Sequence, residues 1–198
     1  MTTLPDASAR RRAAAIAGHV GDLTIARSLI EDEEPSVRAT ALGALARLGA
    51  LDAPALRRAL SDEHPSVRRR ATELAAGRDD VSLLALLDDP DASVVESAAF
   101  ACGERAAAEP GVVARLSRLA TEHADALVRE AAVAGLGAIG DGAGLPAILA
   151  AAADKPAVRR RAVIALAPFE GPEVEAALRA ALGDRDWQVR QAAEDLLA

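Results

Sequence analysis

The sequence predicts an all-α protein built as an α-α superhelix, and three observations support this fold class. Apolar residues make up 51% of the 198-residue chain but aromatic residues only 2%, so the core must consist mainly of Ala, Leu and Val. Ala and Leu are strong helix formers, whereas strands favour β-branched and aromatic side chains. A phrase containing "PSVR" or a close variant recurs along the chain, and apolar residues within each copy have helical spacing.

The repeat is clearest when its copies are aligned on one valine, with a degenerate seventh copy starting at Ala9. The aligned valines are Val37, Val67, Val94, Val128, Val158 and Val189. Their successive spacings are 30, 27, 34, 30 and 31 residues, which is typical of a solenoid of stacked supersecondary units. We therefore predict a single repeat domain over residues 1–198, with about six helical hairpins, an additional N-terminal helix and a flexible N-terminus over residues 1–7.

The phrase itself predicts the second helix of each hairpin. An alanine stands four residues after every aligned valine and Leu often follows at seven or eight, which produces one apolar stripe at helical spacing. Three residues before the valine, Asp91, Asp125 and Asp186 are good N-caps, and Pro follows this position directly in three copies. His64 and Lys155 stand at the same position and are poor caps.

Shorter apolar runs between the phrases predict the first helix of each hairpin. These runs begin at Asp22, Ala53, Val81, Gly111, Gly144 and Pro172. Linkers such as "GAIGDGAGLP" from Gly137 supply Gly at a helix exit and Pro near the next helix start. The spacings of 27 and 34 residues on either side of Val94 predict an irregular repeat at that point.

These repeats resemble HEAT repeats, and most closely the short HEAT-like repeats of bilin lyases. The resemblance covers residues 8–198 and rests on the "VR" pair, the later Ala and Leu, the exit "LGAIGD" from Leu136, and an acid six residues before the arginine. It implies a structural ladder in which each acid satisfies backbone donors and an arginine of the same or the next repeat. The clearest ladder residues are Asp32 with Arg38, Asp62 with Arg68, and Asp184 with Arg190.

Two rungs of this ladder are expected to be broken. Val95 stands where the arginine should be, and Asp154 lies one residue closer to Arg159 than the pattern requires.

A helical wheel predicts which residues of the second helices point away from the core. At 100 degrees per residue, positions two, six and nine after the valine lie opposite the apolar stripe. The HEAT resemblance implies that this face lines a concave groove. Position nine is small throughout, as in Gly18, Gly103 and Gly137, so we expect a floor that a partner can approach closely. The predicted binding surface comprises Arg69, Glu73, Glu96, Phe100, Glu130, Arg160 and Ile164, although Phe100 also suits a gap-filling role in the irregular repeat.

The predicted function is a non-enzymatic scaffold for a protein or peptide partner, whose identity the sequence leaves open. A net charge of -7 and a pI near 5.0 argue against nucleic acid as the partner, because nucleic-acid affinity depends on neutralising phosphates. Three arginine triplets keep open the alternative of nucleic-acid or anionic-ligand binding, although acidic turns close by favour a solvated face of mixed charge. The triplets are Arg10 to Arg12, Arg68 to Arg70 and Arg159 to Arg161.

No catalytic, cofactor-binding or metal-binding motif is found. His19, His64 and His123 are far apart in the sequence, and Cys102 lies on the apolar stripe, where a buried and inert thiol is expected. Bilin lyases and alkylpurine DNA glycosylases are similar in their hairpin construction, so an enzyme of this type is a second alternative. The scarcity of aromatic residues argues against both activities.

The chain has no apolar segment long enough for a signal sequence or a membrane span, and its single cysteine agrees with a reducing compartment. We therefore expect a cytoplasmic protein with no membrane partner. Because the chain begins on a helix of the second type and ends on "DLLA", Ile16 or Leu197 would be exposed at an end. A monomer or weak end-to-end self-association is expected.

Overall fold

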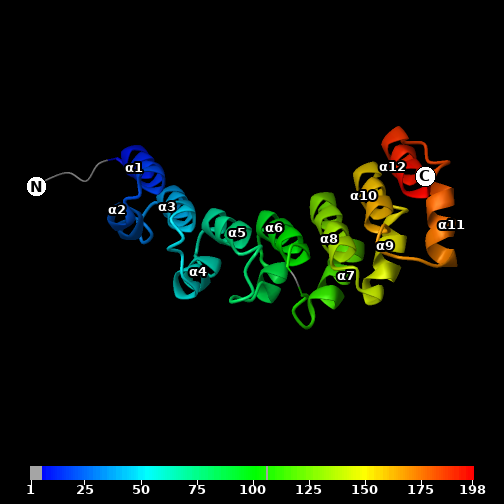
Figure 1. The fold of residues 1–198 in the computed structure, drawn as a ribbon, viewed down its shortest axis with the longest axis horizontal. Coiled ribbons are helices and arrows are strands. Elements are labelled where there is room, and N and C mark those ends of the chain that lie inside the picture. The colour runs from blue at the N-terminus through cyan, green and yellow to red at the C-terminus, as the bar shows by residue number, and fades with distance from the viewer. Residues whose placement is uncertain (1–5, 106) are drawn as a thin grey trace, which may run out of the picture. The chain divides into compact units, whose positions relative to one another are not determined.

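A computed structural model describes residues 6–105 and 107–198, and every regular secondary-structure element of these residues is a helix, as predicted. Twelve α-helices and two 3-10 helices are found within these ranges (Figure 1). They form two compact units, Met1–Val81 and Ser82–Ala198. The organisation of the whole chain as one domain stays a prediction. Of the predicted flexible N-terminus, residues 1–5 lie outside the described residues, whereas Asp6 caps the first helix through a hydrogen bond from the Ala9 amide.

The first unit consists of one helix followed by two hairpins. Its helices are α1 (Ala7–Val20), α2 (Leu23–Ser28), α3 (Pro35–Arg47), α4 (Ala53–Leu60) and α5 (Pro65–Leu74). The second helices of the hairpins, α3 and α5, pack side by side with α1 in one layer, and the first helices α2 and α4 form the other (Figure 1).

The second unit contains four hairpins arranged in the same two layers. Its first helices are η1 (Leu84–Asp88), α7 (Val112–Glu122), α9 (Leu145–Ala151, preceded by η2, Gly142–Gly144) and α11 (Pro172–Ala181). Its second helices are α6 (Ala92–Gly103), α8 (Ala126–Ile139), α10 (Pro156–Ala165) and α12 (Trp187–Leu197). Each second helix contacts the next one along the chain, which builds a continuous layer from α6 to α12.

One predicted α-helix is wrong, because the run from Val81 forms only the short 3-10 helix η1. This run belongs to the 27-residue repeat, which has too few residues for a full first helix. It also ends in Asp88 and Asp89 followed by Pro90, and the residue before a proline is biased away from helical conformation. In the following 34-residue repeat the extra residues form the segment that carries Glu109, whose carboxylate accepts hydrogen bonds from the Ser82 hydroxyl at 2.6 Å and the Leu83 amide at 3.4 Å.

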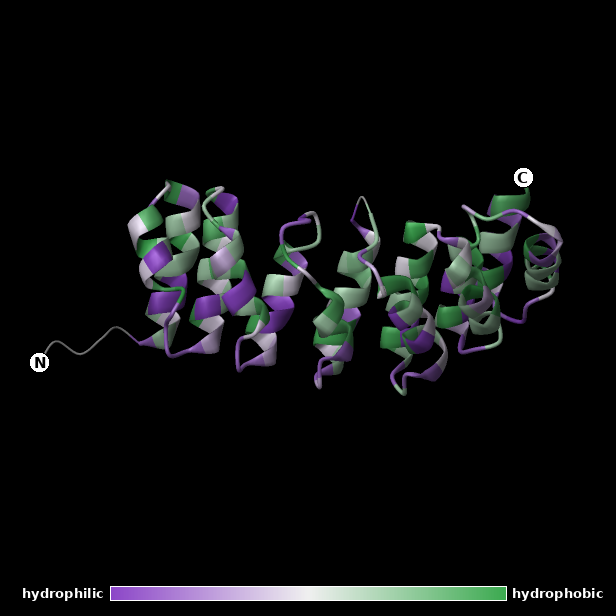
Figure 2. Cartoon of the chain, turned by 90° about the horizontal axis from the view of Figure 1, so that it is seen from below, coloured by the Kyte–Doolittle hydropathy of each residue, from purple (hydrophilic) through white to green (hydrophobic). Residues whose placement is uncertain are grey.

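The core combines the predicted aliphatic stripe of the second helices with large aliphatic residues of the first helices, among them Leu56, Leu116 and Ile148. All six aligned valines are at most 1% exposed, and the alanine four residues after each of them is fully buried. The helices carry both hydrophobic and hydrophilic residues (Figure 2). This is typical of amphipathic helices, which pack one face against the core and expose the other to solvent. Among the described residues, no helix combines the length and the apolar character that crossing a bilayer requires.

The helix starts follow the predicted capping pattern with one correction. The carboxylates of Asp91, Asp125 and Asp186 each accept a hydrogen bond from the amide two residues further on. His64, expected to be a poor cap, accepts a hydrogen bond on Nδ1 from the Ser66 amide at 3.3 Å, because an unprotonated ring nitrogen is an acceptor like a carboxylate oxygen. Lys155 makes no capping hydrogen bond, as expected.

The charged ladder links α1, α3, α8 and α10 to the turn before the next second helix. Arg38 on α3 donates from Nε and Nη2 to the carboxylate of Asp62 at 2.9 and 2.7 Å, and from Nη1 to the Asp32 carbonyl at 2.8 Å. The Asp62 carboxylate also accepts the His64 amide at 2.9 Å, so it shapes the turn that it links. The same arrangement joins Arg10 to Asp32, Arg129 to Asp154, and Arg159 to Asp184. Arg68 and Arg190 donate to the carbonyls of Asp62 and Asp184 in their own repeats.

Of the two rungs expected to be broken, only one is. Asp154 accepts both hydrogen bonds from Arg129, because its turn is one residue shorter and its carboxylate binds the adjacent Lys155 amide instead of the second one along. At Val95 the rung is absent, and Val95 is buried at 2% exposure. The acid position in the turn before α8 is occupied by His123, whose Nδ1 accepts the Asp125 amide at 3.1 Å. His123 thus preserves the turn without providing a carboxylate for a rung.

The glycines at position nine serve helix packing, which corrects for them the prediction that the row floors a groove. Ala167, at the same position, is exposed and lines an open groove next to α12. A Cβ atom at Gly137 on α8 would lie 2.7 Å from the Cα of Ala165 on α10, and one at Gly103 on α6 would lie 2.9 Å from the Cα of Gly135. Gly18 on α1 meets Ala44 on α3 in the same way, at 2.8 Å. These glycines let neighbouring second helices approach closely, so their surface is covered by the protein itself.

Candidate functional site

An open groove of about 500 Å³ crosses the layer formed by α1, α3 and α5 in the first unit. Two rows of residues with the predicted wheel positions two and six line it: Arg11, Ala39 and Arg69, and Ala15, Gly43 and Glu73. The groove therefore lies on the face that the second helices turn away from the core. Arg69 and Glu73, two of the predicted binding residues, belong to it.

The groove of the first unit carries net positive charge. Its lining includes the four arginines Arg11, Arg47, Arg69 and Arg70, and Glu73 is the only carboxylate among the described lining residues. Glu73 is shared, since its carboxylate lies 2.9 Å from Arg70 Nη1 and 4.0 Å from Arg69 Nη1. Four guanidinium groups and one carboxylate leave three positive charges in this groove, on a chain whose net charge is -7.

Arg11 and Arg47 form no ion pair with a carboxylate among the described residues. The Arg11 side chain is exposed and makes no hydrogen bond or ion pair within the part of the chain that the structure describes. Arg47 Nη1 lies 3.1 Å from His19 Nε2, and because a guanidinium can only donate, this ring nitrogen of His19 is the acceptor. The guanidinium of Arg70 lies against Gly43, where a Cβ would be 2.8 Å from its Nη2. Arg11, Arg69 and Arg70, which come from two of the three arginine triplets, thus line one groove.

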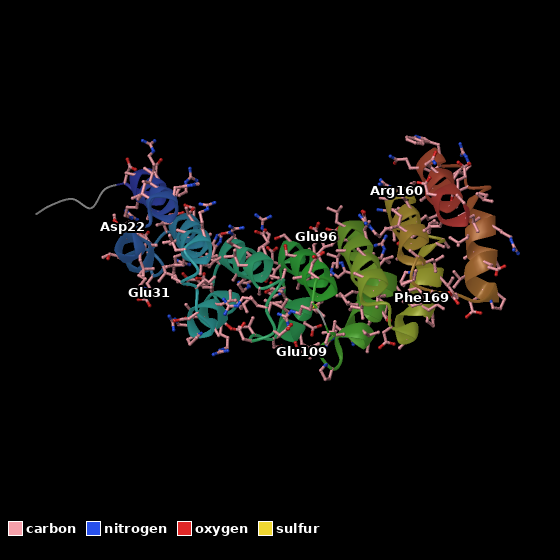
Figure 3. The ribbon with its side chains drawn as sticks, viewed as in Figure 1. Asp22, Glu31, Glu96, Glu109, Arg160 and Phe169 are labelled. Carbon is pink, nitrogen blue, oxygen red and sulfur yellow. The ribbon has the colours of Figure 1, made fainter. Side chains whose placement is uncertain are left out.

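In the second unit, Glu96 and Phe100 lie on α6 and Glu130 on α8. Glu96 lies on the same edge of this unit as Arg160 on α10, and Glu109 lies on the opposite edge (Figure 3). Phe100 is 42% exposed, so it does not fill a gap in the irregular repeat. Glu130 accepts a hydrogen bond from Arg161 on α10 at 3.4 Å and is half-buried by this contact.

A second open groove, of about 380 Å³, lies between α10 and α12. Its lining combines the predicted residues Arg160 and Ile164 with Trp187, Leu196 and Asp195. Trp187 is 64% exposed, Ile164 38% and Leu196 37%. Three large apolar side chains therefore face solvent in one groove, beside one positive and one negative side chain.

Comparison with known protein families identifies the family to which this chain belongs. The model of the HEAT repeats matches residues 1–77 and 81–157, and that of the PBS lyase HEAT-like repeat matches residues 158–184. The chain belongs to the HEAT-repeat family. A comparison with curated proteins finds no match.

Solved structures with a similar fold include two natural proteins and a designed one. YibA of Escherichia coli has a TM-score of 0.65 at 19% identity, over 98% of this chain and 76% of its own. Human deoxyhypusine hydroxylase has a TM-score of 0.51 at 24% identity, over 98% of this chain and 80% of its own. A designed armadillo repeat protein in complex with the peptide (KR)4 has a TM-score of 0.50 at 17% identity, over 96% and 89%. At these identities the similarity describes the HEAT-type fold.

Within these HEAT repeats, the wheel missed Arg47 and Trp187. Arg47 stands ten residues after Val37, one position beyond the last row considered. Trp187 stands two residues before Val189, and at 100 degrees per residue this position lies only about 40 degrees from position two on the exposed face. Including the positions that flank the three rows would have found both residues.

His64, His123 and Cys102 occupy structural positions in these HEAT repeats, whereas His19 lines the first groove. His64 Nδ1 lies 2.7 Å from the Ser66 hydroxyl, but the same nitrogen caps α5, so this pair belongs to the helix start. Cys102 is buried, and burial raises the pKa of its thiol to about 11. In the described ranges, no three His, Cys, Asp or Glu side chains are grouped so that they could hold a metal ion.

Proposed function

We propose that this HEAT-repeat protein is a non-enzymatic scaffold that binds a protein or peptide through the exposed face of its second helices. The observation that carries the proposal is the groove between α10 and α12. There Trp187, Ile164 and Leu196 are exposed together in an open groove, next to Arg160 and Asp195. Trp, Tyr and Arg side chains contribute most of the binding energy of many protein interfaces when a partner covers them.

The predicted residues Glu96, Phe100 and Glu130 extend this surface along the second helices of the same unit. Phe100 supplies a further exposed apolar contact, and the two carboxylates supply charge selection. The complex of a designed armadillo repeat protein with a (KR)4 peptide illustrates that a repeat protein of this general fold can bind a peptide. The partner of this chain, its cytoplasmic location and its state as a monomer or a weakly self-associating chain stay predictions.

An enzymatic function has less support. Human deoxyhypusine hydroxylase is an enzyme by name, but at 24% identity its likeness extends to the fold only. The two grooves present guanidinium, imidazole, hydroxyl, amide, carboxylate and apolar groups. Ser66 lines the first groove and its hydroxyl lies 2.7 Å from His64 Nδ1, but the same nitrogen accepts the Ser66 amide as the cap of α5, so this pair belongs to the helix start.

Affinity capture with matched surface variants tests the proposal. The full chain is immobilised as wild type, as Ile164→Asp and as Leu182→Asp, and incubated with lysate of the source organism. Leu182 follows α11 in the first-helix layer and is 40% exposed, so its substitution adds the same charge at similar exposure outside the groove. We expect a protein that wild type and Leu182→Asp retain and Ile164→Asp loses. Equal retention by all three, with equal helicity by circular dichroism, would refute this surface.

A further inference from the structure

We propose that the groove of α1, α3 and α5 binds an acidic peptide segment, an extended run with several Asp or Glu side chains. The inference rests on the proposed scaffold function, whose exposed second-helix face it shares, but it concerns the other unit and another chemistry. Its basis is the charge, the donor geometry and the dimensions of this groove.

The charge of the groove is opposite to that of the chain. Three uncompensated positive charges lie within about 500 Å³, although the chain as a whole carries -7. Long-range repulsion therefore discourages acidic partners everywhere except at a local positive site, so an acidic segment binds only where it fits the groove. An equally positive segment meets both Arg11 and Arg69 and is excluded.

The donors in the groove suit carboxylates. All four cations are arginines, whose planar forks bind a carboxylate through two parallel hydrogen bonds. Glu73 shows that these arginines hold a carboxylate, since it accepts a hydrogen bond from Arg70 Nη1 at 2.9 Å and lies 4.0 Å from Arg69 Nη1. Arg11 has no partner among the described residues, so its fork is available to a carboxylate of a ligand.

The dimensions fit an extended peptide. Neighbouring packed helices lie about 10 Å apart, so Arg11 on α1 and Arg69 on α5 are separated by roughly 20 Å. An extended chain rises about 3.3 Å per residue, and about six residues span this distance. Ala15, Ala39 and Gly43 stand between the arginines and leave room for a peptide backbone.

Nucleic acid fits the same groove less well. Single-stranded nucleic acids gain much of their affinity from bases stacked on aromatic side chains. No Phe, Tyr or Trp is among the described residues that line this groove. The aromatic side chain of Trp187 lines the groove of the other unit.

Fluorescence anisotropy with the full chain tests the inference. Three fluorescein-labelled probes are titrated at low salt: an octapeptide of alternating Glu and Ser, the same peptide with Lys for Glu, and an eight-nucleotide oligothymidine. We expect the Glu probe to bind at least about tenfold more tightly than the other two. The double variant Arg11→Glu, Arg69→Glu should weaken its binding at least tenfold, and Arg11→Ala alone should weaken it severalfold.

The control is a double variant of equal net charge. Arg27 on α2 and Arg58 on α4 are exposed in the first-helix layer, so Arg27→Glu, Arg58→Glu should leave the affinity for the Glu probe within about twofold. Equal losses in both double variants would mean diffuse attraction and would overturn the inference. Tighter binding of the oligothymidine, lost in the groove variant, would assign the groove to nucleic acid instead.

Failure of this inference is separate from failure of the proposed function. If wild type does not bind the Glu probe at millimolar concentration, the acidic-peptide site is refuted. The capture experiment at Ile164 depends on an apolar groove in the other unit and gives its own answer.

Discussion

Arg159 donates two hydrogen bonds to Asp184, from Nε to Oδ2 at 2.8 Å and from Nη2 to Oδ1 at 2.7 Å. The two side chains are only 8% and 14% exposed. The hydrogen bonds from Arg159 lower the pKa of the Asp184 carboxyl to about 2, against the opposing effect of its burial. Arg159 also donates to the Asp154 carbonyl at 2.8 Å, so one side chain fastens two successive turns.

Acid should destabilise the protein by protonating the carboxylates of this ladder. Hydrogen bonds from Arg10 and Arg129 likewise lower the pKa of Asp32 and Asp154. An ordinary Asp in the unfolded chain has a pKa of about 3.9, so the folded form binds fewer protons there and its carboxylates stabilise it fully at higher pH. This stabilisation is lost as pH falls from about 4 towards 2. We expect the free energy of unfolding, measured by urea titration, to fall across this window, and less steeply in Asp184→Asn.

Removing one partner of a rung should cost stability. Arg159→Ala leaves the poorly exposed carboxylate of Asp184 without its cation, and breaking such a pair costs about 3 kcal/mol. The control is Arg179→Ala on α11, whose ion pair with Glu175 at 2.8 Å is 70% and 59% exposed and is worth less than about 0.5 kcal/mol. Urea denaturation at neutral pH measures both. Similar losses in the two variants would show that the ladder has no special role.

The missing rung should be restorable. Val95→Arg alone places a cation at a position that is 2% exposed without an acid in the turn before α8, and we expect a loss of at least about 2 kcal/mol. Adding His123→Asp supplies that acid, and the double variant should regain at least about 1 kcal/mol. Thermal unfolding of the two single variants and the double variant gives this coupling energy. A coupling of zero would mean that the two positions do not face each other.

Close packing of the second helices predicts a difference between two glycines. Gly137→Ala would push a methyl group against the Ala165 backbone at 2.7 Å, and overpacking of this kind costs about 1–3 kcal/mol. Gly142→Ala meets no atom within 4 Å and should be neutral or stabilising by up to about 1 kcal/mol. Differential scanning calorimetry of both variants tests the assignment of the small residues to packing. If Gly137→Ala is as stable as wild type, these residues are free to form a surface.

Most of the fold follows from the sequence because its determinants are local and repeated. The valine and alanine stripe, the Asp caps and the glycine at Gly140, where φ is +69°, all act within one helix or turn. Features that depend on a neighbouring repeat were not predictable in this way. The rung at Asp154 forms because the turn shortens around it, and Gly137 looks like surface on a wheel until α10 is packed against it.

The candidate surfaces were partly predictable for the same reason. The wheel identifies Arg69 and Ile164 as exposed because exposure follows from helical phase. It does not reveal that Arg11 and Arg69, which are 58 positions apart in the sequence, share one groove, because this depends on how three helices stack.

The central claim is that a partner covers the exposed face of the second helices, and the most direct test is calorimetric titration of the purified captured partner against the full chain. We predict that Ile164→Asp raises the dissociation constant at least about tenfold, whereas Leu182→Asp changes it less than about twofold. Unchanged affinity of Ile164→Asp together with a large loss in Leu182→Asp would place the partner on the first-helix layer and contradict the account.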